Sequence, residues 1–398
     1  MRISTACGAA DQVVSCCQET QPLKDILAHH TILVLGGYGF FGTRICQALA
    51  GKRDIHLLVA GRDAARARAL VAQLGLPPRQ ALALDAVAPD LARRLTELGV
   101  DTLIHTAGPF QGQDYRVARA AIEAGANYID LADGRDFVAG IASLDDLARQ
   151  RGVFITSGAS SLPALSSAVV DRYLPRFRQL TSIRHGIASG ARAPGIATMA
   201  GIFSYCGKPF QRLVAGSQQT THGWLDLKRH RFAAPVGRRL LGSCDVPDLA
   251  LFPQRYPGLD TVTFHAGFAG VPGHLFVWAA AQLVRLGLLR SLLPLVRPLH
   301  AISQWVEPLV SDKGAMFVTL QGTGLDGLPL TLTWQLLAAQ NHGPHIPCGA
   351  SIALANRLAS ANSGGAPLPR GAMPCIGLLT VENYLAALQG HDVTEVPA

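Results

Sequence analysis

The stretch "ILVLGGYGFFGTRI", residues 32–45, decides how the chain begins to fold. An apolar run typical of a buried parallel strand passes through four glycines into residues with helical spacing. The glycines fit two fingerprints at once: Gly37, Gly39 and Gly42 spell G-x-G-x-x-G, and Gly36, Gly39 and Gly42 spell G-x-x-G-x-x-G. Either pattern lets the backbone approach a pyrophosphate at a helix N-terminus. The stretch therefore predicts a dinucleotide-binding βαβ unit and leaves two enzyme classes open.

Strand and helix patterns then alternate six times, with connections of only a few residues. This rhythm predicts an α/β fold with a doubly wound parallel sheet, whose ligands lie beyond the carboxyl ends of the strands. The expected strands are 31–37, 55–62, 80–86, 101–110, 127–133 and 153–160. We expect a Rossmann domain at 31–160, preceded by an extension at 1–30 that shows no sustained period.

The rhythm changes after residue 160, where a helical pattern is followed by strand patterns interrupted by glycines. This change predicts an α+β substrate domain at 161–340 with a mostly antiparallel sheet. Its expected strands are 181–190, 259–270, 314–324 and 328–338, and its expected helices are 162–177 and 196–207. The strand at 314–324 reads as exposed and could pair across a homodimer. The last segment, 341–398, holds two late helical patterns and a turn-rich loop at 360–372.

Composition excludes several classes of protein. The net charge is +8, but the densest basic stretch, 227–232, is short, and a nucleic-acid binder usually concentrates its charge more strongly. We interpret this surplus as a solvated face, with contact to an anion or a phospholipid as the alternative. The eight cysteines form no C-x-x-C pair, so the sequence predicts no zinc site and favours reduced thiols in the cytoplasm.

The apolar segment 274–302 is the best candidate for a membrane span. Arg285, Arg290, Arg297 and two prolines interrupt it, whereas a span needs about 20 mostly apolar residues without charges. We expect amphipathic helices and no transmembrane span. Packing into the core is the favoured interpretation, and peripheral contact with a membrane surface or the lining of an apolar ligand tunnel are the alternatives.

The end of the second strand pattern, "LVAGRD", bears on the choice of cofactor. An acidic residue there would bind both ribose hydroxyls of NAD, but position 60 is Ala. Arg62 stands where a 2′-phosphate would lie, so NADP is favoured, while Asp63 leaves NAD as the less favoured cofactor. Asp85, at the end of the third strand pattern, is a candidate for contact with the adenine.

The chemistry of short-chain dehydrogenases depends on Tyr-x-x-x-Lys, and none of the seven tyrosines has a lysine four residues on. That reading of the glycines is therefore excluded, and Gly37, Gly39 and Gly42 are assigned to the phosphates, with Gly36 as a small neighbour in the turn. The segment "HTAGPFQGQDYRVARAAIEAGANYIDLADGRDF", residues 105–137, resembles the saccharopine dehydrogenase-like NADP-binding proteins. The resemblance covers 31–165 well, and beyond it the chain is similar to uncharacterised bacterial members.

The resemblance implies a Rossmann domain, an α+β substrate domain, and a C-terminal segment, 341–398, that packs back on the first domain. It also implies that Ala107, Gly108 and Pro109 pass along the nicotinamide ribose of NADP. The cofactor-binding residues expected from the motifs and the resemblance are Gly37, Tyr38, Gly39, Phe40, Phe41, Gly42, Gly61, Arg62, Asp63, Asp85, Ala107, Gly108, Pro109 and Phe110.

Hydride transfer needs one acid to deliver or accept a proton. Asp133 is the first candidate and Asp130 the second, because both lie at the end of the fifth strand pattern; His105 is a weaker candidate. Arg192 is a candidate for binding a substrate carboxylate. Relatives often carry Gly-Glu where this chain has Asp133 and Gly134, so the resemblance transfers no catalytic acid. The sequence predicts an NADP(H)-dependent oxidoreductase acting on an imine, enoyl or carbonyl group of a small, hydrophobic substrate. The alternative is a non-catalytic NADP(H)-binding redox sensor.

Overall fold

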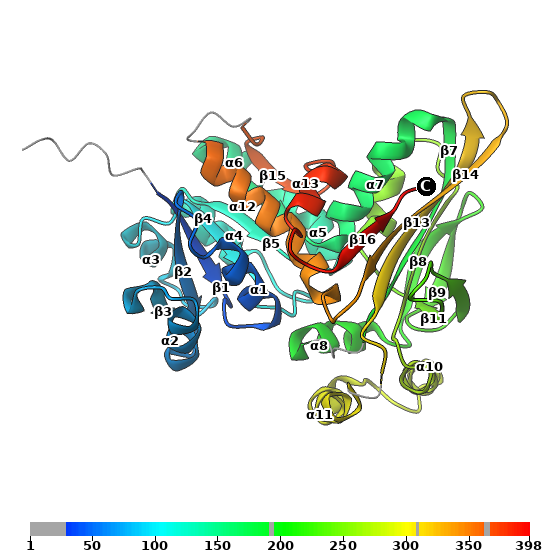
Figure 1. Ribbon diagram of the computed structural model, residues 1–398, viewed down its shortest axis with the longest axis horizontal. Helices are drawn as coiled ribbons and strands as arrows, with labels where there is room; N and C mark the ends of the chain where they lie inside the picture. The colour runs from blue at the N-terminus through cyan, green and yellow to red at the C-terminus, as the bar shows by residue number, and fades with distance from the viewer. Residues whose placement is uncertain (1–28, 191–194, 308–309, 362–366) are drawn as a thin grey trace, which may run out of the picture.

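The computed structural model describes residues 29–190, 195–307, 310–361 and 367–398. Of the expected extension at 1–30, only residues 29 and 30 are described. The candidate Arg192 lies outside the described residues. Two sheets stand side by side with helices around and between them (Figure 1). This arrangement confirms the predicted α/β fold with a second domain built on its own sheet.

The first sheet has seven strands in the order β15-β6-β5-β4-β1-β2-β3, and every pair is parallel. The strands are β1 (His30–Leu35), β2 (Ile55–Gly61), β3 (Ala81–Ala83), β4 (Thr102–His105), β5 (Asn127–Asp130), β6 (Phe154–Ser157) and β15 (Gly371–Pro374). The helices are α1 (Phe40–Leu49), α2 (Ala64–Gln73), α3 (Leu91–Glu97), α4 (Arg116–Glu123), α5 (Arg135–Gly140) and α6 (Asp145–Arg151). The strand order reverses between β1 and β4, which is where doubly wound sheets open a crevice.

The second sheet has the order β10-β11-β12-β7-β13-β14-β16, and β8 and β9 extend it beside β12. Its strands are β7 (Phe177–Ala188), β8 (Pro209–Val214), β9 (Ser217–His222), β10 (Lys228–Arg231), β11 (Arg238–Ser243), β12 (Thr261–Gly267), β13 (Gly314–Gly324), β14 (Pro329–Ala338) and β16 (Val393–Val396). Only β7 and β12 pair in parallel, so the sheet is mixed and mostly antiparallel.

Helices α7 (Ser166–Tyr173), α9 (Asp248–Arg255), α12 (Gly349–Ala361) and α13 (Val381–Ala386) complete the main body. In Figure 1 the ribbons of α12 and α7 run between the two sheets. Buried residues of β1, α1, β7, β13 and α12 join one hydrophobic core, and the opposite face of the first sheet has a core of its own. Both sheets therefore pack against one shared core, and the cleft of the candidate site lies next to it.

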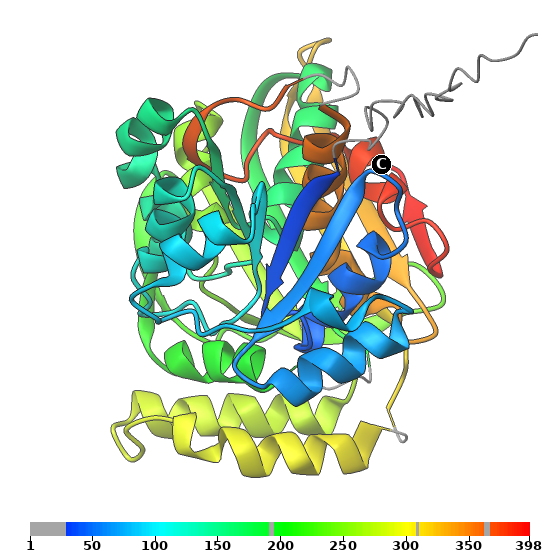
Figure 2. The same cartoon turned by 90° about the vertical axis from the view of Figure 1, so that its left-hand side faces the viewer.

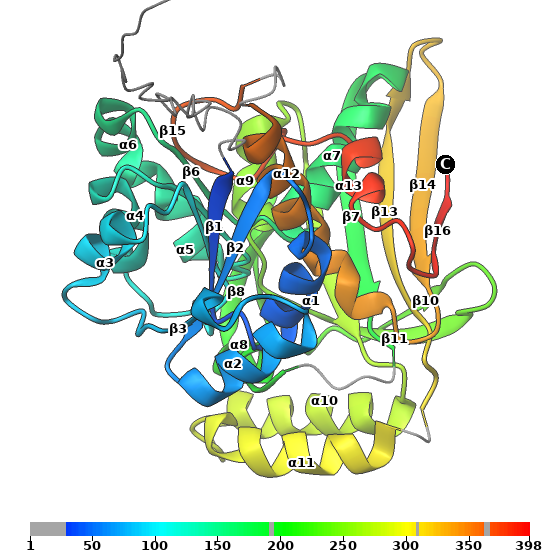
Figure 3. The ribbon, with the colours of Figure 1, turned by 60° about the vertical axis from the view of Figure 1, so that its left-hand side comes forward.

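Helices α8 (Ile196–Tyr205), α10 (Val271–Arg285) and α11 (Val296–Val306) lie at one end of the molecule. Figures 2 and 3 show α10 and α11 side by side as a layer beneath both sheets. Among the described residues, no helix is both long enough and apolar enough to cross a membrane.

Three expectations need correction. β13 is hydrogen-bonded on both sides, to β7 and β14, so 314–324 is not an exposed strand free to pair with another chain. The basic stretch 227–232 contains β10, a strand not expected from the sequence, and three of its four residues are exposed. The turn-rich loop at 360–372 ends in β15, which pairs with β6. Core packing is wrong for most of 274–302, because many apolar side chains of α10 and α11 are exposed.

Candidate functional site

A cleft of about 1320 Å³ lies beyond the carboxyl ends of β1, β2 and β4, where sheets of this topology bind ligands. The loop from Gly36 to Phe41 forms its floor, and the loops after β2, β3 and β4 form one wall. Residues 195–200 around the start of α8, and His300 and Gln304 of α11, form the opposite wall. Its size suits a molecule much larger than a metabolite of a few carbon atoms.

Both glycine fingerprints apply to the loop, because its glycines have different roles. Gly36 has a φ of +85°, and a Cβ there would lie 2.7 Å from the Oγ1 of Thr106. A Cβ on Gly42 would lie 2.2 Å from the carbonyl oxygen of Gly36. Gly36 and Gly39 line the cleft, whereas Gly37 and Gly42 do not. Gly36 is therefore more than a small neighbour, because it makes the left-handed turn that exposes the start of α1 to the cleft.

The loop after β2 presents two arginines to the cleft. The Tyr38 ring covers Gly61, and its hydroxyl accepts a hydrogen bond from the Asp63 amide at 2.7 Å. Arg66, which the sequence interpretation missed, stacks on that ring with its Cζ 4.7 Å from the ring centre. Arg62 is exposed, and no carboxylate of the described residues pairs with it.

The Asp63 carboxylate has a structural role. One of its carboxylate oxygens accepts hydrogen bonds from the amides of Ala65 and Arg66, and so caps the N-terminus of α2. Asp63 does not line the cleft. Asp63, the only acidic residue at this strand end that could have bound the ribose hydroxyls of NAD, is therefore occupied as a helix cap. The choice between NAD and NADP then depends on the arginines.

The loop after β4 lines the cleft with Ala107, Gly108 and Pro109, as the resemblance implied. The Gln113 side-chain amide donates hydrogen bonds to the carbonyl oxygens of Ala107 at 3.1 Å and Pro109 at 2.6 Å, which hold the loop in place. Asp85 also lines the cleft and accepts a hydrogen bond from the Val87 amide.

Phe110 departs from the expected set. Its side chain is only 5% exposed and packs against the rings of His105 and Phe137. Its place as a cofactor contact is therefore wrong for the side chain, because the chain turns inward as soon as the loop passes Pro109. His105 is buried in the same cluster, and burial lowers its pKa to about 4, so it is a neutral core residue.

Asp130 is a structural carboxylate. It is fully buried, and one oxygen accepts hydrogen bonds of 2.9 Å from the amides of Ala132 and Gly158 and from the hydroxyl of Ser157. These bonds tie the end of β5 to the end of β6, and burial raises its pKa to about 6. The second catalytic candidate thus has a structural role, because it is fully buried and is not among the residues that line the cleft.

Asp133 lies in the loop between β5 and α5 and is accessible, although protein surrounds it. The Gln111 amide donates a hydrogen bond of 2.9 Å to its carboxylate, and the desolvation imposed by its surroundings raises its pKa. Gln111 in turn packs beside Gly201 of α8, so this carboxylate sits where the two domains meet. An accessible aspartate with a raised pKa holds a proton more readily than a free one.

Tyr205 and an ion pair complete this junction. Tyr205, at the end of α8, lies near the charges of Asp133 and Asp245, and burial raises its pKa well above the usual value. Arg135 pairs with Asp245, which leaves Asp133 without a cation of its own. Burial raises the pKa of the Cys244 thiol beside Tyr205 to about 12, so neither group ionises at neutral pH.

Among the described residues, no group of histidine, cysteine and carboxylate side chains could hold a metal ion. In the C-terminal segment, His342 and His345 contact His391, and the three rings meet edge to face or at a tilt. The His342 ring accepts a hydrogen bond from the Asp392 amide, which fits a role in holding the loop.

Several cleft residues had no signal in the sequence. The helices α8 and α11 contribute Thr198, His300 and Gln304, and their distance from the motifs hid them. The signal for Arg66 was available, because it lies in the first turn of the helix that directly follows Arg62.

The chain is similar to known proteins in the same region. Residues 32–170 match the family model described as the saccharopine dehydrogenase NADP binding domain. Over its length, the chain is similar to the apo, histidine-tagged saccharopine dehydrogenase (L-Glu forming) from Saccharomyces cerevisiae, with a TM-score of 0.65 and 15% identity, covering 93% of this chain and 100% of that chain. The amine dehydrogenase from Mycobacterium smegmatis has a TM-score of 0.47 and 12% identity, covering 89% and 97% of the two chains. No curated protein sequence matches the chain.

The match confirms the predicted resemblance: the chain carries a saccharopine dehydrogenase-like NADP-binding domain, and NADP is its cofactor. The likeness to the yeast enzyme, at 15% identity, confirms the two-domain oxidoreductase fold alone. The glycine loop and the unpaired Arg62 fit this cofactor, since a side chain at Gly36 would collide with the loop after β4 and Arg62 is free to meet a 2′-phosphate.

Proposed function

We propose that the protein is an NADP(H)-dependent oxidoreductase that reduces an imine, enoyl or carbonyl group of a small, apolar substrate. The observation that carries the proposal is a large cleft lined by the glycine loop and by two arginines, with an accessible carboxylate of raised pKa next to it. Arg62 and Arg66 line the cleft. Asp133 does not line it, but its hydrogen-bond partner Gln111 directly precedes Gly112, which does. When bound, NADPH supplies the hydride.

We infer the role of each cleft residue from its place. The amides at the start of α1, with Gly36 and Gly39, would hold the pyrophosphate, and Gly37 and Gly42 would permit the close packing beneath it. Arg62 and Arg66 would bind the 2′-phosphate, since a guanidinium offers several donors to a dianion. All the remaining expected residues of the cleft would share the rest of the cofactor: Tyr38, Phe40, Phe41, Gly61 and Asp85 would contact its adenosine half, and Ala107, Gly108 and Pro109 its nicotinamide half.

Asp133 is the proposed proton donor. Its surroundings keep the carboxyl protonated more often than that of a solvated aspartate, and Gln111 orients it with one hydrogen bond. Tyr205 stays neutral beside it and excludes water from that side. General acids of this kind contribute about 10²–10⁴-fold to a rate.

The reaction takes place, in this proposal, in the cytoplasm. The five cysteines that the structure describes are free and buried, as expected for a reducing compartment.

Turnover separates an enzyme from a redox sensor. The purified protein would be incubated with NADPH and a panel of imines, enals and ketones with alkyl chains of increasing length, while the absorbance of the reduced nicotinamide is followed. We expect oxidation of NADPH with one of these classes and a rate that rises with chain length. Tight NADPH binding without oxidation by any class would favour the sensor.

Asp133→Asn tests the proton donor, with Asp136→Asn as the matched control on an exposed carboxylate three residues away. We expect Asp133→Asn to lower kcat about a hundredfold while its NADPH affinity matches the wild type. Equal rates for Asp133→Asn and Asp136→Asn would exclude Asp133 as the acid.

A further inference from the structure

The hairpin formed by α10, the connection 286–295 and α11 exposes an apolar surface. Eleven of the eighteen exposed large apolar side chains of the described residues lie between 271 and 305. Trp305 is 87% exposed, Leu288 70% and Leu286 69%. Monomeric proteins scatter such residues singly, so a cluster of this size marks a surface that something covers.

The exposed residues form stripes along one side of each helix. In α10, Leu275, Phe276 and Leu283 follow a spacing that places them on one face, and in α11, Ile302 and Trp305 do the same. The list of exposed apolar side chains on the hairpin is completed by Val271, Leu286, Leu288, Leu289, Leu293 and Leu295. The connection between the helices is thus as apolar as the helices themselves.

The opposite sides of the helices fix how the hairpin sits. His274, Val277, Ala280 and Ala281 of α10 are buried against the body of the protein. On α11, His300 and Gln304 line the cofactor cleft. The apolar stripes therefore point away from the body, and the hairpin has a defined outer face.

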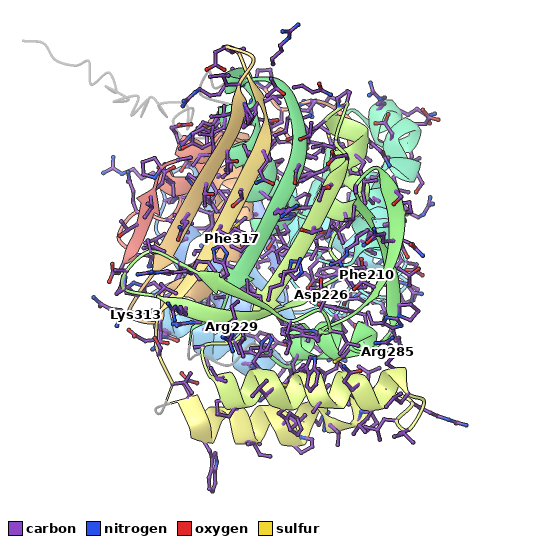
Figure 4. The ribbon with its side chains drawn as sticks, turned by 90° about the vertical axis from the view of Figure 1, so that its right-hand side faces the viewer. Phe210, Asp226, Arg229, Arg285, Lys313 and Phe317 are labelled. Carbon is purple, nitrogen blue, oxygen red and sulfur yellow. The ribbon has the colours of Figure 1, made fainter. Side chains whose placement is uncertain are left out.

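The charges around this face are all positive. Residues 271–306 contain no aspartate or glutamate, and Arg285, Arg290 and Arg297 are all exposed. Figure 4 shows Arg285 at the end of α10, on the side of the sheet. An apolar stripe flanked by arginines complements a surface that is apolar within and anionic at its boundary.

We propose that the α10–α11 hairpin docks on the surface of a membrane that contains anionic phospholipids. The apolar stripes would enter the boundary between headgroups and acyl chains, and Arg290 and Arg297 would contact lipid phosphates. The 15 residues of α10 span about 22 Å at 1.5 Å per residue, less than the hydrocarbon core of about 30 Å, so the helix lies along the membrane surface.

A second copy of the chain fits the same face less well. Symmetric pairing of two hairpins would bring their arginines together, and the segment offers no carboxylate to compensate them. An acidic membrane surface supplies the missing negative charge.

Docking would also orient the cofactor cleft. Because α11 carries the membrane-facing stripe on one side and cleft residues on the other, the cleft would lie close to the membrane. This step rests on the proposed function, and it assigns the substrate to the class of amphipathic molecules held in a bilayer.

The test is vesicle co-sedimentation of the full chain, which needs no turnover. Vesicles of phosphatidylcholine alone are compared with equal mixtures of phosphatidylcholine and phosphatidylglycerol. We expect binding to the anionic vesicles that weakens with added salt, because part of the attraction is electrostatic. The double variant Leu286→Ser/Leu288→Ser should weaken this binding at least tenfold. The double variant Arg290→Gln/Arg297→Gln should abolish the preference for anionic vesicles.

Leu325→Ser/Leu328→Ser, two exposed apolar residues at the β13–β14 turn, is the matched control and should bind vesicles as the wild type does. NADPH affinity, measured in parallel, reports whether each variant is folded. The proposal is overturned if the chain ignores both kinds of vesicle, if all variants bind equally, or if the chain forms dimers in solution that Trp305→Ser dissociates. Vesicle binding without NADPH binding would sink the proposed function and leave the docking surface intact.

Discussion

The two walls of the cofactor cleft are built in opposite ways. The wall made by the ends of β1, β2 and β4 rests on buried strands, and its glycines touch backbone atoms of neighbouring loops. The wall made by α8 and α11 is lightly anchored, and most of α11 is exposed or half-buried. The difference indicates that the first wall has its final shape before the cofactor binds, whereas the second wall belongs to an exposed part of the molecule.

The largest expected effect falls on the rigid wall. Asp130→Ala leaves two buried amides and the Ser157 hydroxyl without an acceptor, so we expect the free energy of unfolding to fall by about 4 kcal/mol. Asp130→Asn keeps one carbonyl oxygen and should cost far less. Urea unfolding measures both, and equal losses would show that this carboxylate does not tie β5 to β6.

The next effect concerns the left-handed turn. Gly36→Ala places a methyl group against Thr106 and Ala107, and should weaken NADPH binding about a hundredfold, since a Cβ in this conformation costs energy even without the collision. Gly51 also has a positive φ, but a Cβ there meets nothing within 4 Å. Titration calorimetry should therefore find wild-type affinity for Gly51→Ala, and a similar loss in both variants would contradict a role for the close contact.

The helix α10, which lies beside the lightly anchored wall, should respond to acid. His274 fixes α10 to the body beside Trp224 and Phe268, and burial lowers its pKa to about 4. The unfolded state then binds more protons than the folded state between pH 6.5 and 4, so stability contributed by neutral His274 is lost as the pH falls through that range. We expect protonation linked to His274 to lower the free energy of unfolding by about 2 kcal/mol at pH 5 relative to pH 7.

His274→Phe removes the titrating ring and keeps its shape. Thermal unfolding at a series of pH values should show a flatter decline for this variant than for the wild type, while His105 contributes equally to both proteins. If the thermal stability of the wild type and of the variant falls equally with pH, His274 is not the cause of the loss of stability in acid.

The smallest effect concerns specificity for the cofactor. Arg62→Ala should weaken NADPH binding about tenfold and leave NADH binding unchanged, because only NADPH carries the 2′-phosphate. Arg151→Ala, an exposed arginine on α6 outside the cleft, is the control. Equal losses for NADPH and NADH would remove Arg62 from phosphate recognition.

The rigid wall is also the part that the sequence predicted well. The strands of the first sheet are continuous apolar runs that end in glycines or small residues, and these local patterns placed β1 to β6 and the glycine loop. The second sheet was predicted only where its strands are long and apolar. β10 was read as a charged patch because "KRHR" pairs along an edge, where arginines can reach water on both sides.

Contacts between distant parts of the chain were beyond local patterns. Asp130 and Asp133 are three residues apart, and only the position of β6 decides that the first is enclosed and the second accessible. The exposure of α10 and α11 likewise depends on what the body leaves uncovered. β15 is a strand because β6 offers it an edge, and the paired residues Thr156 and Met373 are 217 positions apart in the sequence.

The C-terminal segment has a consequence for the order in which the protein is made. β15 pairs with β6, and β16 pairs with β14, so the last stretch of chain closes an edge of each sheet. The ribosome makes these two strands after the strands that they cover, and until then β6 and β14 each present one unpaired edge to their surroundings. A chain interrupted before Gly371 would carry two open edges and become a substrate for chaperones and proteases. The sheet of the dinucleotide-binding domain therefore stays open at β6 until residues 371–374 have been made.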